Sequence, residues 1–344
     1  MAAKIAVLAL TRGGVALAEK LVAQLPGGIV FSCRGKMRRT LHRCWQEFDS
    51  LVCIMATGIV VRTLAPLLVD KREDPAVVVC DEKGHFAVSL LSGHLGGGNA
   101  LAGQVARILG GQAVITTASD VLGRTALDLW CRELGLTAVD KEGLNRVMGK
   151  LVNSGSIRLY SDVDLPDLPD DIVPAAHPDE ADLVVTYRTD LQVPGVLLHP
   201  KILTAGIGCN RNTPAAEIEQ ALEEACAVNH LALQSIKALA SIDLKDDEPG
   251  LLAFARSREY TIEFYNRDQL NGVDGVSTSA AVLKAVGAKG VAEPAAVLAA
   301  GGGQLLVNKM KWPNVTVAVA RGSVNNNFVE MSGQGDIDLV DLIE

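Results

Sequence analysis

The chain has 344 residues and a formal net charge of −8, and 49% of its residues are apolar. This length predicts more than one domain, and the apolar fraction excludes a disordered chain. The acidic balance argues against nucleic acid as the main partner, because neutralising phosphates requires a basic face.

Apolar runs in the sequence are short. None approaches the roughly 20 residues that span a bilayer, and the first is too short for a signal peptide, so we expect a cytoplasmic protein that does not enter a membrane. The seven cysteines show no metal-ligand spacing. This predicts free thiols in a reduced chain and no metal held by the protein.

The first 136 residues alternate between short apolar strands and amphipathic helices. This alternation predicts an N-terminal α/β domain, an open and mainly parallel sheet with helices on both faces. The strands are expected at residues 4–10, 28–33, 51–56, 76–80 and 113–117, and the helices at 14–25, 58–68 and 100–109.

The rest of the chain is predicted to hold two further parts and a tail. Residues 137–200 form a small middle module, in which a helix at 141–153 precedes an acidic, proline-rich stretch of exposed connection and edge structure. A second α/β domain follows at 201–322, closed by two strands. Residues 323–344 are a polar tail.

A glycine-rich loop, LLSGHLGGGNALAG at residues 90–103, separates two apolar runs. Asn99 is a candidate N-cap of the following helix, and the preceding glycines would then present bare N–H groups to an anion. A tight turn whose backbone demands glycine remains the alternative. His94 is the candidate acid or base. The candidate binding residues of this loop are Ser92, Gly93, Gly96, Gly97 and Asn99.

A second strand–turn–helix, ATGIVVRTL, offers Thr57 as a cap, with Gly58 and Arg62 as binding candidates. Ligands of open α/β sheets bind beyond the carboxyl ends of the strands. We therefore expect residues 11–14, 57–58, 92–99 and 116–120 on one rim. The segment RGKMRR at 34–39 adds positive charge there or is a solubilising turn.

The C-terminal domain offers candidates of the same kind. GIGCNRNTP contributes glycines and an arginine ahead of a helix, and SIDLKDDE and VSTSAAV supply polar groups after a strand and at a helix start. Glu293 stands where a cap belongs and is either catalytic or a plain surface residue. The binding candidates are Gly206, Gly208, Arg211, Ser241, Lys245, Ser277 and Ser279.

Several familiar catalytic and nucleotide-binding motifs are absent: GxSxG, HExxH and the P-loop, and the GxGxxG fingerprint after the first strand. A nicotinamide-dependent reductase is therefore disfavoured, although RGKMRR could contact a 2′-phosphate. The residues alone indicate an anion-binding α/β enzyme or binding protein.

Residues 56–102, which include LLSGHLGGGNALA, resemble the N-terminal domain of the cobalt-precorrin-5A hydrolases, the CbiG family of anaerobic cobalamin biosynthesis. GIGCNRNTPAAEIEQAL and IKALASIDLKDDEPGLLAFA resemble the C-terminal domain of that family, which is also similar to the stand-alone protein CobE. The resemblance covers roughly residues 4–140 and 201–320. GGGN stands where GGAN is usual, a change that leaves a backbone-lined loop intact.

The resemblance implies a hydrolase that opens the δ-lactone of cobalt-precorrin-5A and expels the C20 fragment as acetaldehyde, giving cobalt-precorrin-5B. The cobalt arrives with this polycarboxylated macrocycle, so no separate cofactor is expected. The small-molecule substrate is the main partner, and other enzymes of the pathway are candidate partners.

For that reaction we hypothesise His94 or Glu293 as the base, with N–H groups of residues 96–99 as donors to the oxyanion. An axial contact to the substrate's cobalt is an alternative for His94. Arg62, Arg211 and Lys245 would pair with substrate carboxylates. The competing hypothesis is a corrinoid carrier without catalytic activity.

Overall fold

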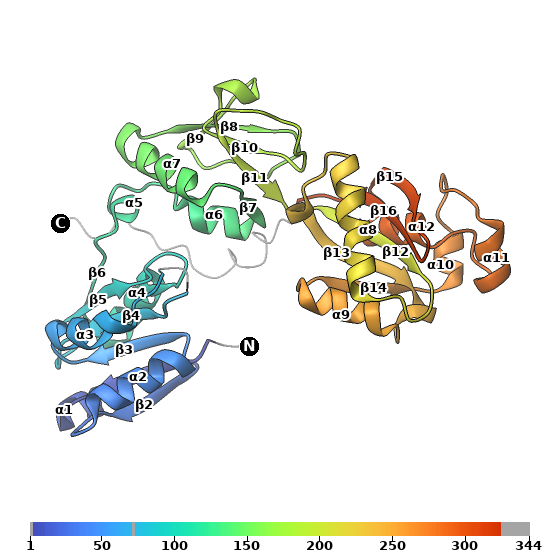
Figure 1. Ribbon diagram of the computed structural model, residues 1–344. Helices are drawn as coiled ribbons and strands as arrows, with labels where there is room; N and C mark the ends of the chain where they lie inside the picture. The colour runs from blue at the N-terminus through green and yellow to red at the C-terminus, as the bar shows by residue number, and fades with distance from the viewer. Residues whose placement is uncertain (1–2, 71–72, 325–344) are drawn as a thin grey trace. The chain divides into compact units, whose positions relative to one another are not determined.

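The computed structural model describes residues 3–70 and 73–324, and its contacts divide the chain into two compact units, Met1–Leu129 and Trp130–Glu344. One six-stranded sheet lies in the first unit and two five-stranded sheets lie in the second (Figure 1). The chain is therefore α/β, as predicted. The predicted tail lies outside the described residues from residue 325 onward, and the proposed domain boundaries remain a prediction.

The sheet of the first unit has the strand order β2-β1-β3-β4-β5-β6. The first four strands in sequence are parallel, as expected for short apolar strands separated by helices. The strands are β1 Ile5–Ala9, β2 Gly28–Ser32, β3 Ser50–Ile54, β4 Ala76–Cys80, β5 Phe86–Leu91 and β6 Gln112–Val114.

Helices cover both faces of this sheet, which confirms the prediction. On one face, Val7, Val52 and Val78 form a core with side chains of α1 and α4. On the other, residues of β1 and β3 pack against α2 and α3. The helices are α1 Arg12–Val22, α2 Met37–Glu47, α3 Thr57–Leu64, α4 Gly98–Leu109, α5 Ala118–Val121 and α6 Leu127–Glu133.

The strand β5 is absent from the sequence prediction, and it changes the topology. It pairs antiparallel with β4 and parallel with β6. The carboxyl ends of β5 and β6 therefore lie at the sheet edge opposite to the carboxyl ends of β1–β4. The expectation of a single rim is wrong: residues 92–99 and 116–120 share one edge, and residues 11–14 and 57–58 lie at the other.

The second unit begins with the sheet β7-β11-β10-β8-β9, which is accompanied by helix α7 Lys141–Ser154. The acidic stretch predicted as exposed structure contains β10, which lies between two other strands and is fully buried. A strand of three residues is too short to show an apolar pattern. The strands are β7 Leu136–Ala138, β8 Ile157–Ser161, β9 Ile172–Pro174, β10 Leu183–Val185 and β11 Val196–Pro200.

The C-terminal sheet has the order β14-β13-β12-β16-β15, in which β12, β13 and β14 are parallel and the closing pair is antiparallel. The strands are β12 Leu203–Cys209, β13 Ile236–Ile242, β14 Thr261–Tyr265, β15 Gln304–Lys311 and β16 Val315–Arg321. The helices are α8 Ala215–Val228, α9 Pro249–Ser257, α10 Arg267–Asn271, α11 Ala280–Val286 and α12 Ala292–Ala299.

All seven cysteines are free thiols, as predicted, and six of them are buried. Burial raises the pKa of the Cys33 thiol to about 11 and that of Cys80 to about 12, so these thiols stay protonated at neutral pH. Among the described residues, no helix has the length and apolar character needed to cross a membrane.

Candidate active site

His94 lies in the loop between β5 and α4, and both of its ring nitrogens face polar groups. Its Nε2 atom is 2.6 Å from Oδ2 of Asp120 and 3.2 Å from the hydroxyl of Ser119. Its Nδ1 atom is 3.7 Å from Oδ1 of Asp128. The His94 side chain is 12% exposed, so it remains reachable from solvent. We call this cluster the His94 corner.

The strand order explains why these residues meet. Since β5 and β6 are parallel, the loop after β5 and the short helix α5 after β6 leave the sheet at the same edge. Asn99 in the first turn of α4 donates to Asp120 Oδ2 at 3.1 Å and to Thr117 at 3.3 Å. Its own Oδ1 is buried without a hydrogen-bond partner among the described atoms. The amide thus orients Asp120 toward His94.

The glycines of this loop build a tight turn. The N–H groups of Gly97, Gly98 and Asn99 donate to carbonyl oxygens of His94, Ser92 and Gly93 at 2.9–3.0 Å. The prediction of bare N–H donors at these positions is therefore wrong, and so is that of an Asn99 cap, because Gly97 is the N-cap. Gly97 has φ +79, which favours glycine.

The other three loop candidates also have structural roles. A Cβ at Gly96 would lie 2.7 Å from the Ser92 carbonyl oxygen, and one at Gly93 would lie 2.6 Å from Asn99 Oδ1. Ser92 donates its hydroxyl to the carbonyl oxygen of Asp74, just before β4. These contacts hold the backbone on which His94 is carried.

Thr57, Gly58 and Arg62 lie together at the opposite edge of the sheet. Thr57 is the first residue of α3 and makes no capping hydrogen bond, so its predicted role as a cap is wrong. The guanidinium of Arg62 folds back along the helix to within 3.4 Å of the position that a Cβ of Gly58 would take. Thr57 also lines a pocket of ≈ 560 Å³ above β4 and β5.

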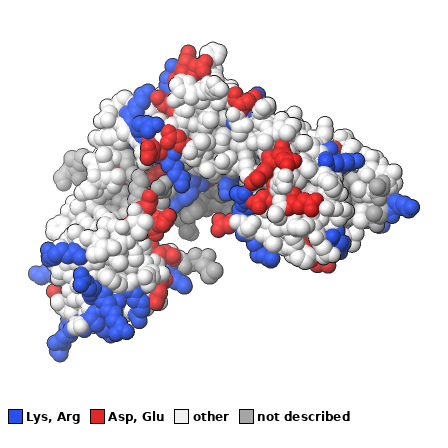
Figure 2. Space-filling view, in the orientation of Figure 1, with Lys and Arg blue, Asp and Glu red and all other residues white. Residues whose placement is uncertain are grey.

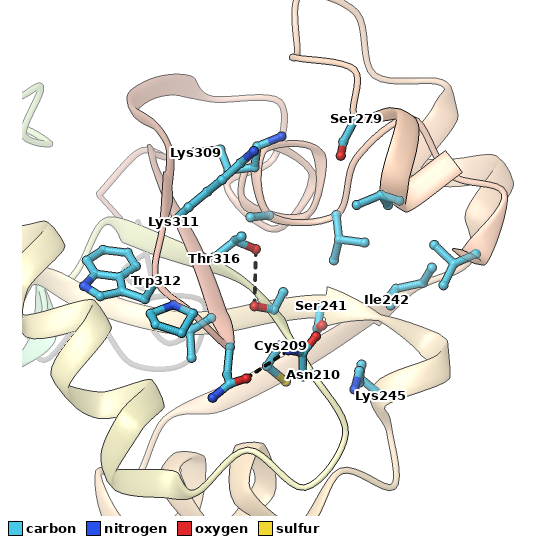
Figure 3. A pocket seen from close by; sticks show the side chains of 18 residues that line it. Cys209, Asn210, Ser241, Ile242, Lys245, Ser279, Lys309, Lys311, Trp312 and Thr316 are labelled. Atoms are coloured by element: carbon cyan, nitrogen blue, oxygen red, sulfur yellow. Dashed lines mark hydrogen bonds between the residues drawn. The ribbon is translucent and has the colours of Figure 1, made fainter. Parts of the chain in front are cut away.

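A second pocket, of ≈ 340 Å³, lies in the C-terminal part at the carboxyl ends of β12 and β13 (Figure 3). The antiparallel strand β16 begins beside the end of β12, where Cys209 pairs with Val315, so the β15–β16 turn closes one side. Valines of α11 and the start of α12 form an apolar wall. The polar lining residues are Asn210, Ser241, Lys245, Ser279, Lys309, Lys311, Trp312, Asn314 and Thr316. We call this the lysine pocket.

Two buried carboxylates hold the lysine pocket in shape. Glu248 is fully buried, lies 3.1 Å from Lys245 Nζ and accepts the backbone N–H of Asn212 at 2.6 Å. Glu293 accepts the backbone N–H of Lys309 at 2.8 Å and that of Ser277 at 2.5 Å. Each carboxylate therefore fixes one side of the pocket.

Glu293 is the second residue of α12, whose N-cap is Val291, and it is buried. The expectation that it stands at the cap, or on the surface, is wrong. Burial raises the pKa of Glu293, whereas the hydrogen bonds from the backbone N–H groups lower it. The hydrogen bonds have the larger combined effect, so the pKa lies below its ordinary value. A carboxylate with both oxygens accepting hydrogen bonds is a weak base, so this environment favours a structural role.

The remaining candidates divide between the pocket and its surroundings. Gly208 and Ser279 line it, and Ser241 donates its hydroxyl to the Ile207 carbonyl oxygen beside it. Gly206 allows close packing of β12 on α12, since a Cβ there would lie 1.8 Å from the Ala292 oxygen. Arg211 is already paired with Asp247 and the Leu244 carbonyl oxygen.

Sequence reasoning missed Asp128 and Lys309 as site residues, and it did not single out Ser119 within the predicted rim segment 116–120. Asp128 follows an apolar residue in a helix and has the appearance of an ordinary exposed acid, but its side chain is 11% exposed. Asp120 belongs to the segment placed on the predicted rim and was not singled out. Across residues 3–70 and 73–324, no group of three or more His, Cys, Asp and Glu side chains could hold a metal ion.

Family models match both ends of the chain. The model "Cobalamin synthesis G N-terminal" matches residues 39–120, and "Cobalamin synthesis G C-terminus" matches residues 203–320. The His94 corner, apart from Asp128, lies within the first match. The lysine pocket lies within the second.

Curated relatives match over most of their length. A cobalt-precorrin-5A hydrolase of Priestia megaterium is 38% identical over 83% of this chain and 82% of its own. One from Salmonella typhimurium is 36% identical over 92% of this chain and 97% of its own. Protein CobE of a Sinorhizobium species is 34% identical over 34% of this chain and 79% of its own.

Proposed function

The chain belongs to the cobalt-precorrin-5A hydrolase family, and we propose that it opens the lactone of cobalt-precorrin-5A with His94 as the group that moves the proton. The observation that carries this proposal is the match to two such hydrolases at 36–38% identity over most of both chains. The geometry of the His94 corner supplies the chemistry.

In the proposed first step, His94 takes a proton from water, whose oxygen attacks the lactone carbonyl. The carbon–oxygen bond of the lactone breaks, and the departing oxygen takes the proton held by His94, which leaves a carboxylic acid and a hydroxyl on the C20 fragment. His94, neutral again, then removes the hydroxyl proton, and the fragment leaves as acetaldehyde. The electron pair of the broken carbon–carbon bond stays on the cobalt-bearing macrocycle, which takes up a proton. One water is consumed overall.

Asp120 and Asp128 stabilise the protonated imidazole between these steps, because they face its two nitrogens at 2.6 and 3.7 Å. The Ser119 hydroxyl, 3.2 Å from Nε2, is the donor we assign to the developing oxyanion. It replaces the N–H groups of Gly97, Gly98 and Asn99, which already donate to carbonyl oxygens of the loop.

The lysine pocket is proposed as a binding site for carboxylate side chains of a corrinoid. Lys309 and Lys311 supply positive charge, Lys245 is paired with Glu248, and the valines offer apolar contact to the ring. At ≈ 340 Å³ the pocket takes part of the macrocycle's periphery, not the whole ring. Glu293 is a positioning residue in this scheme, acting through the backbone of Lys309.

The cobalt is proposed to enter with the substrate, so that the protein needs no resident cofactor. We place the reaction in the cytoplasm, with other enzymes of cobalamin biosynthesis as partners that supply the substrate and consume the product. The match to CobE keeps a carrier role for the C-terminal part as the second candidate.

Acetaldehyde release tests the proposal. Catalytic amounts of the purified chain are mixed with cobalt-precorrin-5A generated without oxygen, and acetaldehyde is followed together with the corrinoid spectrum. Many turnovers per chain support the hydrolase. A tightly bound pigment, with no acetaldehyde released, would overturn it in favour of the carrier.

A further inference from the structure

A strongly basic patch lies over the start of α2 in the first unit, where Figure 2 shows blue side chains gathered together. It consists of Arg34, Lys36, Arg38, Arg39 and Arg62, all exposed. Met37 at the start of α2 contacts Thr63, the residue after Arg62, at 3.7 Å, so the two helices bring these cations together. We call it the basic patch.

No described carboxylate pairs with the basic patch. Over residues 3–70 and 73–324, these five cations form no ion pair, whereas the nearby Arg43 contacts Glu47 at 3.9 Å. Two acids follow β4, and both have partners elsewhere. Asp81 accepts the backbone N–H groups of Lys83 and Phe86 at 2.9 and 2.7 Å, and Glu82 accepts a hydrogen bond from Thr11 at 2.5 Å.

This arrangement costs stability. Helix N-termini favour acids, yet the first turn of α2 contains no acid and two arginines, Arg38 and Arg39. Arg39 and Arg43 are also like charges at i and i+4 on one helix. By contrast, α7 follows the usual pattern, with Asp140 as its cap and Glu142 in its first turn. A chain of net charge −8 does not need this cluster for solubility.

We propose that the basic patch is an anion site that docks the carboxylates of the cobalt-corrinoid substrate, separate from the His94 corner. The inference rests on the proposed function, because it takes the polycarboxylated macrocycle as the ligand. The patch lies at the edge where β1–β4 end, and a five-residue strand is roughly 16 Å long, so the His94 corner, which follows β5 farther across the sheet, lies at least about that far away.

The chemistry of the patch suits this ligand. Four of its five cations are arginines, whose planar guanidinium binds a carboxylate through two parallel hydrogen bonds. The Arg62 guanidinium lies against Gly58. The two sequence neighbours of Gly58, Thr57 and Ile59, line the ≈ 560 Å³ pocket. That pocket is mainly apolar and offers contact to a macrocycle. A chain with an overall negative charge repels a polyanion at long range, and a local positive field offsets this repulsion.

The double variant R38E/R39E tests the proposal, with K20E/R107E as its control. Lys20 and Arg107 are exposed and lie in the last turns of α1 and α4, on the other face of the sheet. Both variants change the net charge equally. The probe is cobyrinic acid, a stable cobalt corrinoid with free carboxylates, titrated at low and at high salt.

We expect R38E/R39E to raise the unfolding temperature by about 1–2 °C, because it places acids at a helix N-terminus. The same variant should weaken cobyrinic acid binding at least roughly tenfold at low salt, and the difference should vanish at high salt. The control should lower the unfolding temperature slightly and leave binding within about twofold.

Unchanged binding of cobyrinic acid by R38E/R39E would overturn the proposal, whatever the effect of the variant on stability. If inorganic phosphate at equal concentration displaces cobyrinic acid from the basic patch, the assignment of corrinoid carboxylates as the ligand is overturned. Failure of the proposed function is a separate outcome, since the unmodified chain would then release no acetaldehyde whatever the patch binds.

Discussion

The His94 corner and the lysine pocket both lie where strands end, yet they are built for different tasks. In the His94 corner, titratable groups face one another, with an imidazole between two carboxylates at 2.6 and 3.7 Å. In the lysine pocket, carboxylates are buried beneath the surface and their partners include Lys245 and backbone N–H groups. The first arrangement can move a proton, and the second can only hold charge. Variants of the two regions should therefore fail in different kinetic constants.

The largest effect is expected from His94→Ala. Removal of a general base costs about 10²–10⁴-fold in rate, so kcat for acetaldehyde release should fall by that factor. The control is His85→Ala, because His85 is exposed at the start of β5 and lies outside the cluster. A variant that retains more than about a tenth of kcat would remove His94 from the mechanism.

The next largest effect concerns the two carboxylates that flank His94. Asp120→Asn keeps the shape of the side chain but loses a charge-assisted hydrogen bond, worth roughly 1.5–3 kcal/mol, so kcat should fall about 10- to 100-fold. Asp128→Asn should cost less, because its oxygen is 3.7 Å from Nδ1. If Asp128→Asn proves the more damaging, the roles of the two acids are exchanged.

The prediction of the His94 corner from the sequence depended on one strand, β5. The parallel strands β1, β3 and β4 are mainly apolar and fully buried, and they were predicted. By contrast, β5 is half-buried, with the pattern FAVSLL, and follows β4 after only five residues, so it resembled part of the glycine loop. Missing it reversed the edge on which His94 was placed.

The chemistry was predicted less well than the fold, for a physical reason. His94 stands out because its neighbours are glycines, whereas Asp120 and Asp128 become partners of His94 only through packing of α5 and α6. Glu293 was noticed because a carboxylate near a helix start is conspicuous. Its true partners, the N–H groups of Ser277 and Lys309, are each 16 residues away in sequence and could not be inferred.

The lysine pocket should show the opposite kinetic signature. Lys309→Met and Lys311→Met each remove a cation from the lining, so KM should rise roughly tenfold with little change in kcat, as expected when binding is lost equally in the ground and transition states. Lys284→Met, on the exposed side of α11, is the matched control. A drop in kcat at constant KM would instead place these lysines in the chemical step.

The smallest effect is on stability, and it separates Glu293 from the catalytic groups. Glu293→Gln leaves one oxygen to accept a hydrogen bond and should lower the free energy of unfolding by about 1 kcal/mol at neutral pH, without a comparable loss of kcat.

This effect of Glu293 should depend on pH. Because the pKa of Glu293 is lowered from its ordinary value of 4.5, its carboxylate contributes stability above that pH, and this contribution is lost as the pH falls through the pKa of the folded state. Urea unfolding between pH 7 and pH 3 should therefore show the deficit of Glu293→Gln shrinking toward zero in acid. The exposed Glu133→Gln should show no such trend. A kcat loss as large as that of His94→Ala would instead return Glu293 to the role of base, and the distinction between the two regions would fail.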